Sequence, residues 1–186
     1  KPLMNVFVLH RDPVIAANMQ CDKHVVKMIV ESAQMLSTAH RMLDGTMSKR
    51  PSKSGKRMVP HYTLPDWREQ TFYKAVHFNH PCTVWTMMNS GNYSWHWVHF
   101  KALCKEYTYR YGKVHKSESL LLEALEKQPT NIPKGEMSKW PLAMGAAPQC
   151  MMEDVVKSYR AFYHTKQERF KMAWTKREIP DWFQVA

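Results

Sequence analysis

The sequence predicts an all-α protein, a single compact domain of about six helices around a central, aromatic-rich buried helix. Apolar residues recur at helical steps of three and four along several segments. Glycine is scarce, with 6 Gly against 14 Met, 7 Trp and 8 Tyr. The 186 residues are enough to bury a core without disulfide or metal staples. We therefore expect one domain over residues 1–186, with Met4 as the natural start after a short extension.

The N-terminal part of the chain is expected to hold two helices. Residues 5–9 form a short apolar run, which is either one strand or a buried segment. The Asp-Pro pair at 12–13 is typical of a helix start and predicts a short helix to about residue 20. Asp22 is then expected to cap a longer helix that ends at Asp44-Gly45, a glycine stop.

The middle of the chain is expected to contain an exposed loop and three helices. Residues 46–60 combine Ser, Gly and Pro with several basic residues and no acid, which favours an exposed basic loop. Residues 66–79 are expected to be helical, and Pro81 begins another helix. Along 92–111, aromatic and apolar residues cover most sides, which is typical of a central buried helix.

The C-terminal part is expected to contain two helices and an irregular connection. A short helix is predicted over 117–127, and a Pro-rich irregular stretch covers 129–148. The last helix is predicted over about 152–174, because acidic residues occupy its first turn. In the central helix, Trp97 and Tyr107 are expected to be buried core residues.

The charge balance indicates the partner class. Lys plus Arg total 27 against 16 for Asp plus Glu, a formal charge of +11, which favours a polyanion and predicts duplex DNA. No apolar run reaches the roughly 18 residues of a membrane-spanning helix, and no basic-then-apolar leader is present. We expect a cytoplasmic protein with no membrane partner, inside the bacterial host if it is phage-encoded.

The cysteines are expected to be reduced thiols, because they are scattered without a Cys-x-x-Cys pair. They are Cys21, Cys82, Cys104 and Cys150. A zinc site from Cys21, His24, His77 and His80 is conceivable, since both pairs have i, i+3 spacing. The pairs lack a recognised ligand spacing, so we expect no metal and no cofactor.

The first candidate site lies on the polar side of the long helix. His24, Lys27 and Glu31 share one side at helical spacing and supply the base, amine and carboxylate that acid–base or Schiff-base chemistry needs. Asp22 and Lys23 flank them as candidate substrate-binding residues. The alternative is an amphipathic helix with a solvated face and a Lys27–Glu31 surface pair. If the site is functional, His24 and Glu31 lie on the polar side of the helix while its other side supplies the core contacts, so substituting either residue is expected to change stability little.

A second candidate site gathers ring and amide groups near a helix start, where backbone N–H groups favour anions. Its candidate substrate-binding residues are His77, Asn79, His80, Trp85, Asn92 and Tyr93. The alternative is that the polar residues are helix caps and the aromatic residues are core.

A third feature is the basic stretch between residues 46 and 60. Its candidate nucleic-acid-binding residues are Lys49, Arg50, Lys53, Lys56 and Arg57. Basic residues interleaved with Trp and Tyr, including Lys166 and Arg169 further on, suit a phosphate track beside a stacked or flipped base. The alternative is a solvated surface. The sequence contains no P-loop and no Gly-x-Gly-x-x-Gly or Gly-x-Ser-x-Gly motif, so it lacks the usual signatures of those nucleotide-binding and hydrolase folds.

Several segments together resemble a protein family of phages and bacteria that has no established activity. They include Asp22-Lys23-His24-Val25-Val26-Lys27-Met28, the segment 31–39, His77-x-Asn79-His80-Pro81 and the ending Trp174-x-x-Arg177-x-x-Pro180-x-Trp182. This resemblance extends over most of the chain.

The chain is also remotely similar to the phage pyrimidine-dimer DNA glycosylases with AP-lyase activity, the endonuclease V type. The similarity lies in Asp22-x-His24, followed by Glu31 seven residues later inside the first long helix. In place of the arginines that flank the family's glutamate, this chain has Val30 and Ser32. The family attacks the sugar with its N-terminal amine after Met removal, and Asn5 after Met4 is too large for easy removal.

This resemblance implies base excision of damaged or modified pyrimidines in duplex DNA. An amine, either Lys27 or the N-terminal amine, would attack C1′ and form a Schiff base. Glu31 would stabilise the cationic sugar or move protons, and His24 would position a phosphate. The alternatives are a phage enzyme that transfers a group onto a DNA base, a hypermodification transferase, and a non-catalytic DNA-binding or host-takeover protein.

Overall fold

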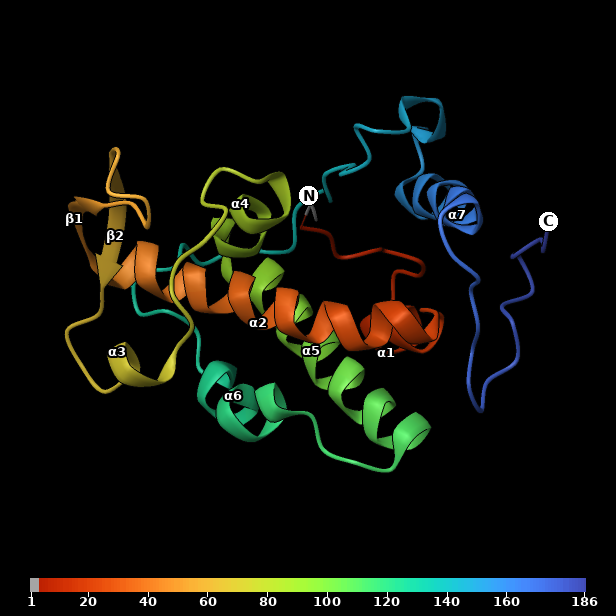
Figure 1. Ribbon diagram of the computed structural model, residues 1–186, viewed down its shortest axis with the longest axis horizontal. Helices are drawn as coiled ribbons and strands as arrows, with labels where there is room; N and C mark the ends of the chain where they lie inside the picture. Colours follow the sequence, from red (N-terminus) through yellow and green to blue (C-terminus); the bar gives the residue numbers. More distant parts are fainter. Residues whose placement is uncertain (1–3) are drawn as a thin grey trace.

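The computed structural model describes residues 4–186, so the predicted extension before Met4 lies outside the described residues. Within that range the chain forms seven α-helices, two short 3₁₀ helices and one two-stranded hairpin (Figure 1). In chain order the elements are α1 (Pro13–Asn18), α2 (Asp22–Asp44), β1 (Thr46–Pro51), β2 (Met58–Thr63), α3 (Arg68–Thr71), α4 (Pro81–Met88), α5 (Ser90–Tyr111), α6 (Lys116–Glu126), η1 (Pro148–Cys150), α7 (Val155–Thr165) and η2 (Lys166–Glu168). About half of the residues are helical, so the fold is predominantly but not purely α.

The first two helices begin where the sequence predicts. The Asp12 carboxylate accepts hydrogen bonds from the backbone N–H groups of Val14 and Ile15, at 2.8 and 3.1 Å, as an N-cap should. The glycine that ends α2 acts differently from the prediction. Gly45 has an extended backbone rather than a left-handed one. A glycine is required at this position because a Cβ atom would collide with the carbonyl oxygen of Arg41.

The predicted basic loop over 46–60 is an antiparallel hairpin. Thr46 pairs with Thr63 and Pro51 with Met58, and the turn between the strands contains Gly55 in the left-handed region, with φ 72°. All six residues of β1 are exposed. Because β1 is exposed and β2 is only half-buried, neither strand needs the apolar alternation that predicts a strand.

The helix predicted over 66–79 is also wrong, since only the single turn of α3 forms. The rest of that segment runs extended past Arg41, whose buried guanidinium donates to the carbonyl oxygens of Tyr62, Glu69, Phe72 and Tyr73. A helix over 66–79 would have bonded the carbonyl groups of Glu69, Phe72 and Tyr73 internally. The buried arginine competes successfully for them.

The last helix is shorter than the predicted 152–174. α7 ends at Thr165, and after η2 the chain runs without regular structure to the C-terminus. Asp22 fixes this tail: its carboxylate accepts from the N–H and hydroxyl of Thr175, at 2.8 and 2.6 Å. The irregular stretch predicted over 129–148 is free of helix and strand up to residue 147 in the described chain, and Pro148 begins η1.

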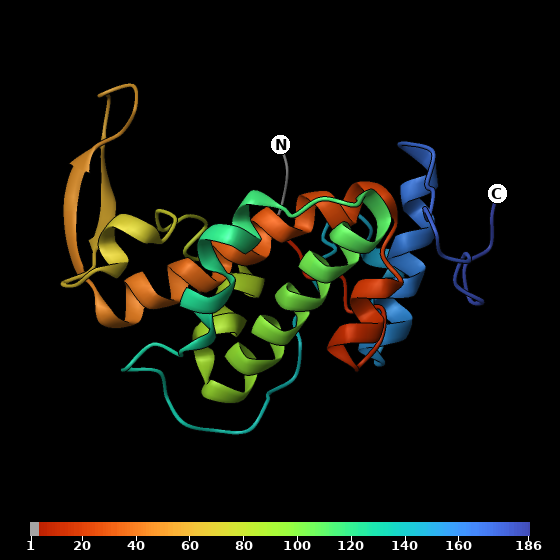
Figure 2. The same cartoon turned by 90° about the horizontal axis from the view of Figure 1, so that it is seen from below.

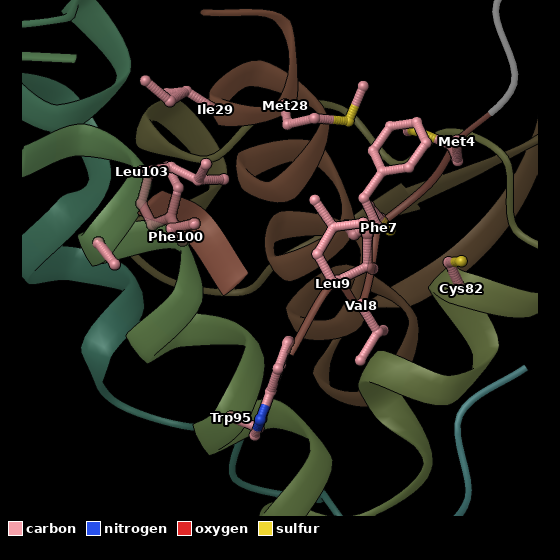
Figure 3. Packing of buried hydrophobic residues seen from close by; sticks show 14 of the residues in the cluster. Met4, Phe7, Val8, Leu9, Met28, Ile29, Cys82, Trp95, Phe100 and Leu103 are labelled. Carbon is pink, nitrogen blue, oxygen red and sulfur yellow. The ribbon is translucent and has the colours of Figure 1, made fainter. Parts of the chain in front are cut away.

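The core forms around α2 and α5, which cross with α4 on one side and α6 on the other (Figure 1). The N-terminal segment over 5–9 is buried but pairs with no strand in the described chain. Figure 3 shows it running between α2 and α4, with Phe7 close to Met28. This segment therefore forms part of the core rather than an edge of a sheet.

The prediction of a central helix is confirmed by α5, which packs against α1, α2, α4 and α6. Two of its aromatic residues differ from expectation. Trp97 and Tyr107 are half-buried, and the Trp97 indole N–H donates to the carbonyl oxygen of Leu122 on α6, at 2.9 Å. They pack at the boundary between α5 and α6.

Two compositional predictions can be compared with the structure. The four cysteines are free and buried, which confirms that they are unpaired thiols. Across residues 4–186, none of the helices combines the length and apolarity that crossing a bilayer requires.

Candidate functional site

A pocket of about 380 Å³ lies where the first turns of α2, the N-terminal segment and the end of α7 meet. Four cationic side chains line it: Lys23 and Lys27 from α2, Lys166 from η2, and Arg169 just beyond η2. We call it the cationic pocket. Residues more than a hundred positions apart in sequence thus form one positively charged cavity, which favours an anionic ligand.

Aromatic rings form much of the wall of the cationic pocket. The Phe7 ring stacks on the His24 imidazole, with centroids 4.5 Å apart and planes 11° apart. The Lys166 ammonium lies 4.2 Å from the centroid of Phe162, and the Lys23 ammonium lies 4.5 Å from that of Phe170. Flat apolar surfaces beside cations suit a ligand that is both planar and charged.

The position of Phe7 depends on a local turn. The Asn5 side-chain oxygen accepts from the N–H groups of Val6 and Phe7, both at 2.8 Å, and its amide donates to the carbonyl oxygen of Ala143. Phe7 itself has φ 55°, a left-handed conformation that costs a non-glycine residue free energy. The surrounding hydrogen bonds hold this strained residue against the pocket.

His24 is a buried, neutral group. Burial is the largest cause that lowers its pKa to about 3, and the neighbouring Lys166 and Lys27 lower it further. Its Nδ1 lies 2.9 Å from the hydroxyl of Tyr163. Its burial contradicts the alternative of a solvated face at this position. The expected role of His24 in positioning a phosphate stays a prediction, which a neutral imidazole would fill as a hydrogen-bond donor.

Glu31 is also buried rather than solvated. Burial is the largest cause that raises its pKa to about 7, against the lowering effect of Lys27. Its Oε2 lies 3.8 Å from the Lys27 ammonium, and its Oε1 has no hydrogen-bond partner in the described residues. A carboxyl group with a pKa near 7 can both donate and accept a proton at neutral pH.

The two lysines nearest to these groups differ in exposure. The Lys27 side chain is 44% exposed, so it lacks the desolvation that would activate it as a nucleophile. Lys166 is half-buried, and burial followed by the nearby Arg169 and Lys27 lowers its pKa. A lowered pKa increases the fraction of neutral, nucleophilic amine.

The sequence analysis grouped Lys166 and Arg169 with the basic residues of a phosphate track and did not place them beside His24, Lys27 and Glu31. They lie in a segment that was predicted as one long helix, and no local spacing connects them to residues 23–31. The most informative signal in the sequence is that Lys166 and Arg169 lie between two aromatic residues, Phe162 and Phe170. Only the folded chain brings this cation–aromatic segment next to Lys23 and Phe7.

Asp22 has a structural role. Its carboxylate pairs with the buried guanidinium of Arg110 at 2.9 Å and anchors Thr175. These contacts occupy its oxygens, whereas Lys23 remains in the wall of the cationic pocket. The structure thus separates two neighbours that the sequence predicts as one substrate-binding pair.

The second candidate group is not part of the cationic pocket. His77 and Asn79 are exposed, and the Nδ1 of His80 accepts from the backbone N–H of Cys82 as the N-cap of α4. This contact supports the capping alternative for His80.

The aromatic and amide members of that group are core residues. The Trp85 indole donates to the carbonyl oxygen of Ser138, and Asn92 exchanges hydrogen bonds with Trp85 and Ser138. The Tyr93 hydroxyl donates to the carbonyl oxygen of Leu125 at 2.6 Å. All three side chains are buried, so they offer no surface to a substrate.

The basic residues Lys49, Arg50, Lys53, Lys56 and Arg57 are all exposed, on β1 and the hairpin turn. The structure gathers them on one projecting element at the far end of α2 from the cationic pocket (Figure 2). The chain therefore has two separate concentrations of positive charge.

No group of three or more His, Cys, Asp or Glu side chains within residues 4–186 is arranged to hold a metal ion. Of the conceivable zinc ligands, Cys21 and His24 both contact the Tyr163 hydroxyl instead. Comparisons with protein-family models, curated proteins and solved structures find no match. The function must therefore be argued from the geometry of the site.

Proposed function

We propose that this protein is a DNA-acting enzyme of the base-excision type, a DNA glycosylase with AP-lyase activity on damaged or modified pyrimidines. The observation that carries the proposal is the cationic pocket itself. It combines four cations and aromatic walls with a half-buried amine, Lys166. One of the four cations, Lys27, also lies 3.8 Å from the carboxyl group of Glu31, whose pKa is about 7.

The cationic pocket suits one nucleotide that has left the base stack. Its volume of about 380 Å³ falls in the range of about 300–1,000 Å³ that small-molecule sites occupy. Phosphates would contact Lys23, Lys27 and Arg169, and a flipped base would stack on the aromatic wall. An enzyme that reacts at a base or its glycosidic bond needs this extrusion.

The first chemical step would break the glycosidic bond. The neutral amine of Lys166 attacks C1′, and the bond from C1′ to the base nitrogen breaks. The base leaves with the bonding electron pair and takes a proton from Glu31, which reacts in its protonated form. Half of the Glu31 side chains carry that proton at a pH equal to its pKa, about 7.

The second step would cleave the strand. The Glu31 carboxylate removes a proton from the nitrogen that is now bonded to C1′. The freed lone pair forms the C=N bond of the Schiff base and breaks the bond from C1′ to the ring oxygen. The ring oxygen takes the proton back from Glu31. Glu31 then removes a proton from C2′, and the electrons expel the 3′ phosphate. Water hydrolyses the imine and regenerates Lys166.

His24 would act as a neutral group in this mechanism. The hydroxyl of Tyr163 contacts both His24 Nδ1 and the sulfur of Cys21, and a ring nitrogen is the stronger acceptor. When the Tyr163 hydroxyl donates a hydrogen bond to Nδ1, the ring hydrogen is on Nε2. The Nε2–H group can then donate to the sugar or the base. His24 also supports Phe7 through stacking.

Borohydride trapping tests the proposal. We expect that incubation with duplex DNA containing an abasic site or a damaged pyrimidine, with borohydride present, gives a covalent protein–DNA adduct. Lys166→Arg keeps the charge but removes the amine nucleophile, so it should abolish the adduct. Lys27→Arg is the matched control and should retain it.

Each other outcome has a defined meaning. Loss of the adduct in Lys27→Arg alone would keep the enzyme class but move the nucleophile to Lys27. Duplex binding without any adduct or strand cleavage would overturn the proposal in favour of a non-catalytic DNA-binding protein. A mass increase of the base without its release would favour a hypermodification transferase.

A further inference from the structure

The β1–β2 hairpin is a strongly basic element whose first strand and turn are exposed. Between residues 46 and 60 it carries five Lys or Arg side chains and no acid, and β1 and the turn are exposed except for the half-buried Ser52. Figure 2 shows it projecting beyond the helices. A folded element this exposed and this basic is suited to contact a polyanion.

The base of the hairpin is firmly attached to the helices. The buried Arg41 donates to the carbonyl oxygen of Tyr62 at 3.0 Å, and the N–H of Leu64 donates to Glu69 at 2.9 Å. The Tyr62 ring also packs against Phe78, with centroids 5.5 Å apart. The hairpin is therefore an arm with a fixed root and a free tip.

The composition of the strands disfavours a protein strand as partner. Each strand contains a proline, Pro51 in β1 and Pro60 in β2. Proline cannot donate a ladder hydrogen bond, and it protects edge strands from further pairing. The positive charge of the hairpin instead matches the phosphates of a nucleic acid.

The shape of the hairpin indicates which nucleic acid. A two-stranded ribbon fits the major groove of B-DNA, which is about 12 Å wide. The major groove of A-form RNA is too narrow and deep for protein elements to read. The hairpin geometry thus favours duplex DNA over duplex RNA.

The distance from the cationic pocket is set by α2. Lys27 lines the pocket and Asp44 ends the helix just before β1, so at 1.5 Å per residue they are roughly 25 Å apart. At 3.4 Å per base pair, this is about seven base pairs of B-DNA. The hairpin and the end of α7 project to the same side of α2 (Figure 2), so one straight duplex can reach both.

We infer that the β1–β2 hairpin is a DNA-binding arm that enters the major groove about seven base pairs from the nucleotide in the cationic pocket. The spacing rests on the proposed function, because it is measured from the flipped nucleotide. The arm itself does not depend on the chemistry in the pocket. Its footprint should extend to one side of the target only, because the chain carries one such hairpin in residues 4–186.

A charge-removal series tests the arm. The tip variant Lys53→Ala/Lys56→Ala/Arg57→Ala removes three charges from the turn. The matched control Lys116→Ala/Lys134→Ala/Lys139→Ala removes three exposed lysines from other elements. With a duplex of about 30 base pairs, we expect the tip variant to bind at least tenfold more weakly at low salt. The slope of log affinity against log salt should become shallower by about 2–3, and the control should keep the wild-type slope.

A footprint fixes the position of the arm. The probe is a duplex with a single tetrahydrofuran abasic analogue, cut with hydroxyl radicals. The wild type and the control should protect the analogue and a second region about seven base pairs to one side. The tip variant should lose only the second region. Far-ultraviolet spectra of both variants check that the fold is unchanged.

The outcomes separate this inference from the proposed function. Three results would each overturn the DNA-binding arm. The first is an unchanged salt slope in the tip variant, and the second is an equal loss of DNA affinity in the tip and control variants. The third is protection that is confined to the abasic analogue. Tip-dependent binding to anionic lipid vesicles without tip-dependent binding to DNA would also overturn it, in favour of a membrane contact. Failure of borohydride trapping with a tip-dependent footprint would overturn the enzyme and leave the arm standing.

Discussion

At the scale of single residues, burial changes the chemistry of groups that the helix pattern places on a solvated face. Glu31 lies one helical turn after Lys27, and His24 directly follows Lys23, yet the two lysines are exposed while His24 and Glu31 are buried. Phe7 of the N-terminal segment and Tyr163 of α7 cover His24. Burial raises the pKa of the carboxyl group to about 7 and lowers that of the imidazole to about 3. Both groups are thus shifted toward their neutral forms.

The raised pKa of Glu31 predicts a pH-dependent effect on stability. The folded state binds the Glu31 proton more tightly than the unfolded state. The free energy of unfolding therefore falls as the pH rises from about 4.5 to about 7, and it stays lowered above pH 7. We expect Glu31→Gln to raise the free energy of unfolding by about 2 kcal/mol near pH 8 and hardly at all near pH 4. Urea unfolding at both pH values measures this, and equal effects at the two would contradict it.

The Tyr163 hydroxyl predicts a second residue-scale effect. It accepts from the backbone N–H of Cys21 at 2.8 Å and contacts Nδ1 of His24. Tyr163→Phe leaves both buried groups unpaired and should cost about 1–3 kcal/mol of unfolding free energy. Tyr111→Phe, at an exposed position, is the control and should stay within about 0.5 kcal/mol. Equal losses in the two variants would argue against the buried contact.

At the scale of elements, one buried arginine decides the structure of a whole segment. Arg41 lies on α2 and donates to four backbone carbonyl groups between residues 62 and 73, besides its ion pair with Glu69. These bonds hold β2, α3 and the extended chain after it. The predicted helix over 66–79 fails for this reason, because its backbone acceptors bind a side chain.

The Arg41 contacts predict a large loss of stability on substitution. Arg41→Met keeps much of the apolar length but leaves the carbonyl groups and Glu69 without their donor. We expect a loss of about 3–5 kcal/mol in unfolding free energy, measured by urea titration. Arg50→Met on the exposed face of β1 is the matched control and should change stability little. Two similar curves would show that Arg41 does not anchor the segment.

At the scale of the whole molecule, four buried histidines make the fold sensitive to acid. They are His24, His40, His96 and His99, whose pKa values burial lowers to about 3, 4, 3 and 4. The unfolded state takes up protons near pH 6.5, where the folded state does not. Stability is therefore complete above about pH 6.5 and is lost as the pH falls toward the folded-state pKa values.

This linkage predicts acid unfolding at a mild pH. Near pH 5 each histidine costs up to about 2 kcal/mol, and four together approach the 5–15 kcal/mol that stabilises a typical domain. We expect a cooperative transition between about pH 6 and pH 4, followed by far-ultraviolet circular dichroism and tryptophan fluorescence. Retention of both signals down to about pH 3 would contradict the burial of these rings.

The sequence by itself determines what depends on neighbours along the chain. Caps and helical periodicity place α1, α2, α4, α5 and α6 within a few residues of their observed ends, because these signals act within one or two helical turns. Composition likewise indicates the excess positive charge, the free thiols and nearly all of the irregular stretch predicted over 129–148. The candidate residues His24, Lys27 and Glu31 are also found this way, since they share one helix side.

The tertiary structure alone decides what depends on contacts between distant segments. It buries Glu31 and His24, turns the basic loop into a hairpin, and shortens the last helix so that Lys166 and Arg169 reach α2. It also removes Trp85, Asn92 and Tyr93 from any site by enclosing them in the core. The physical reason is that desolvation and long-range hydrogen bonds set both the pKa of a group and its access to a ligand, and neither is encoded by local spacing.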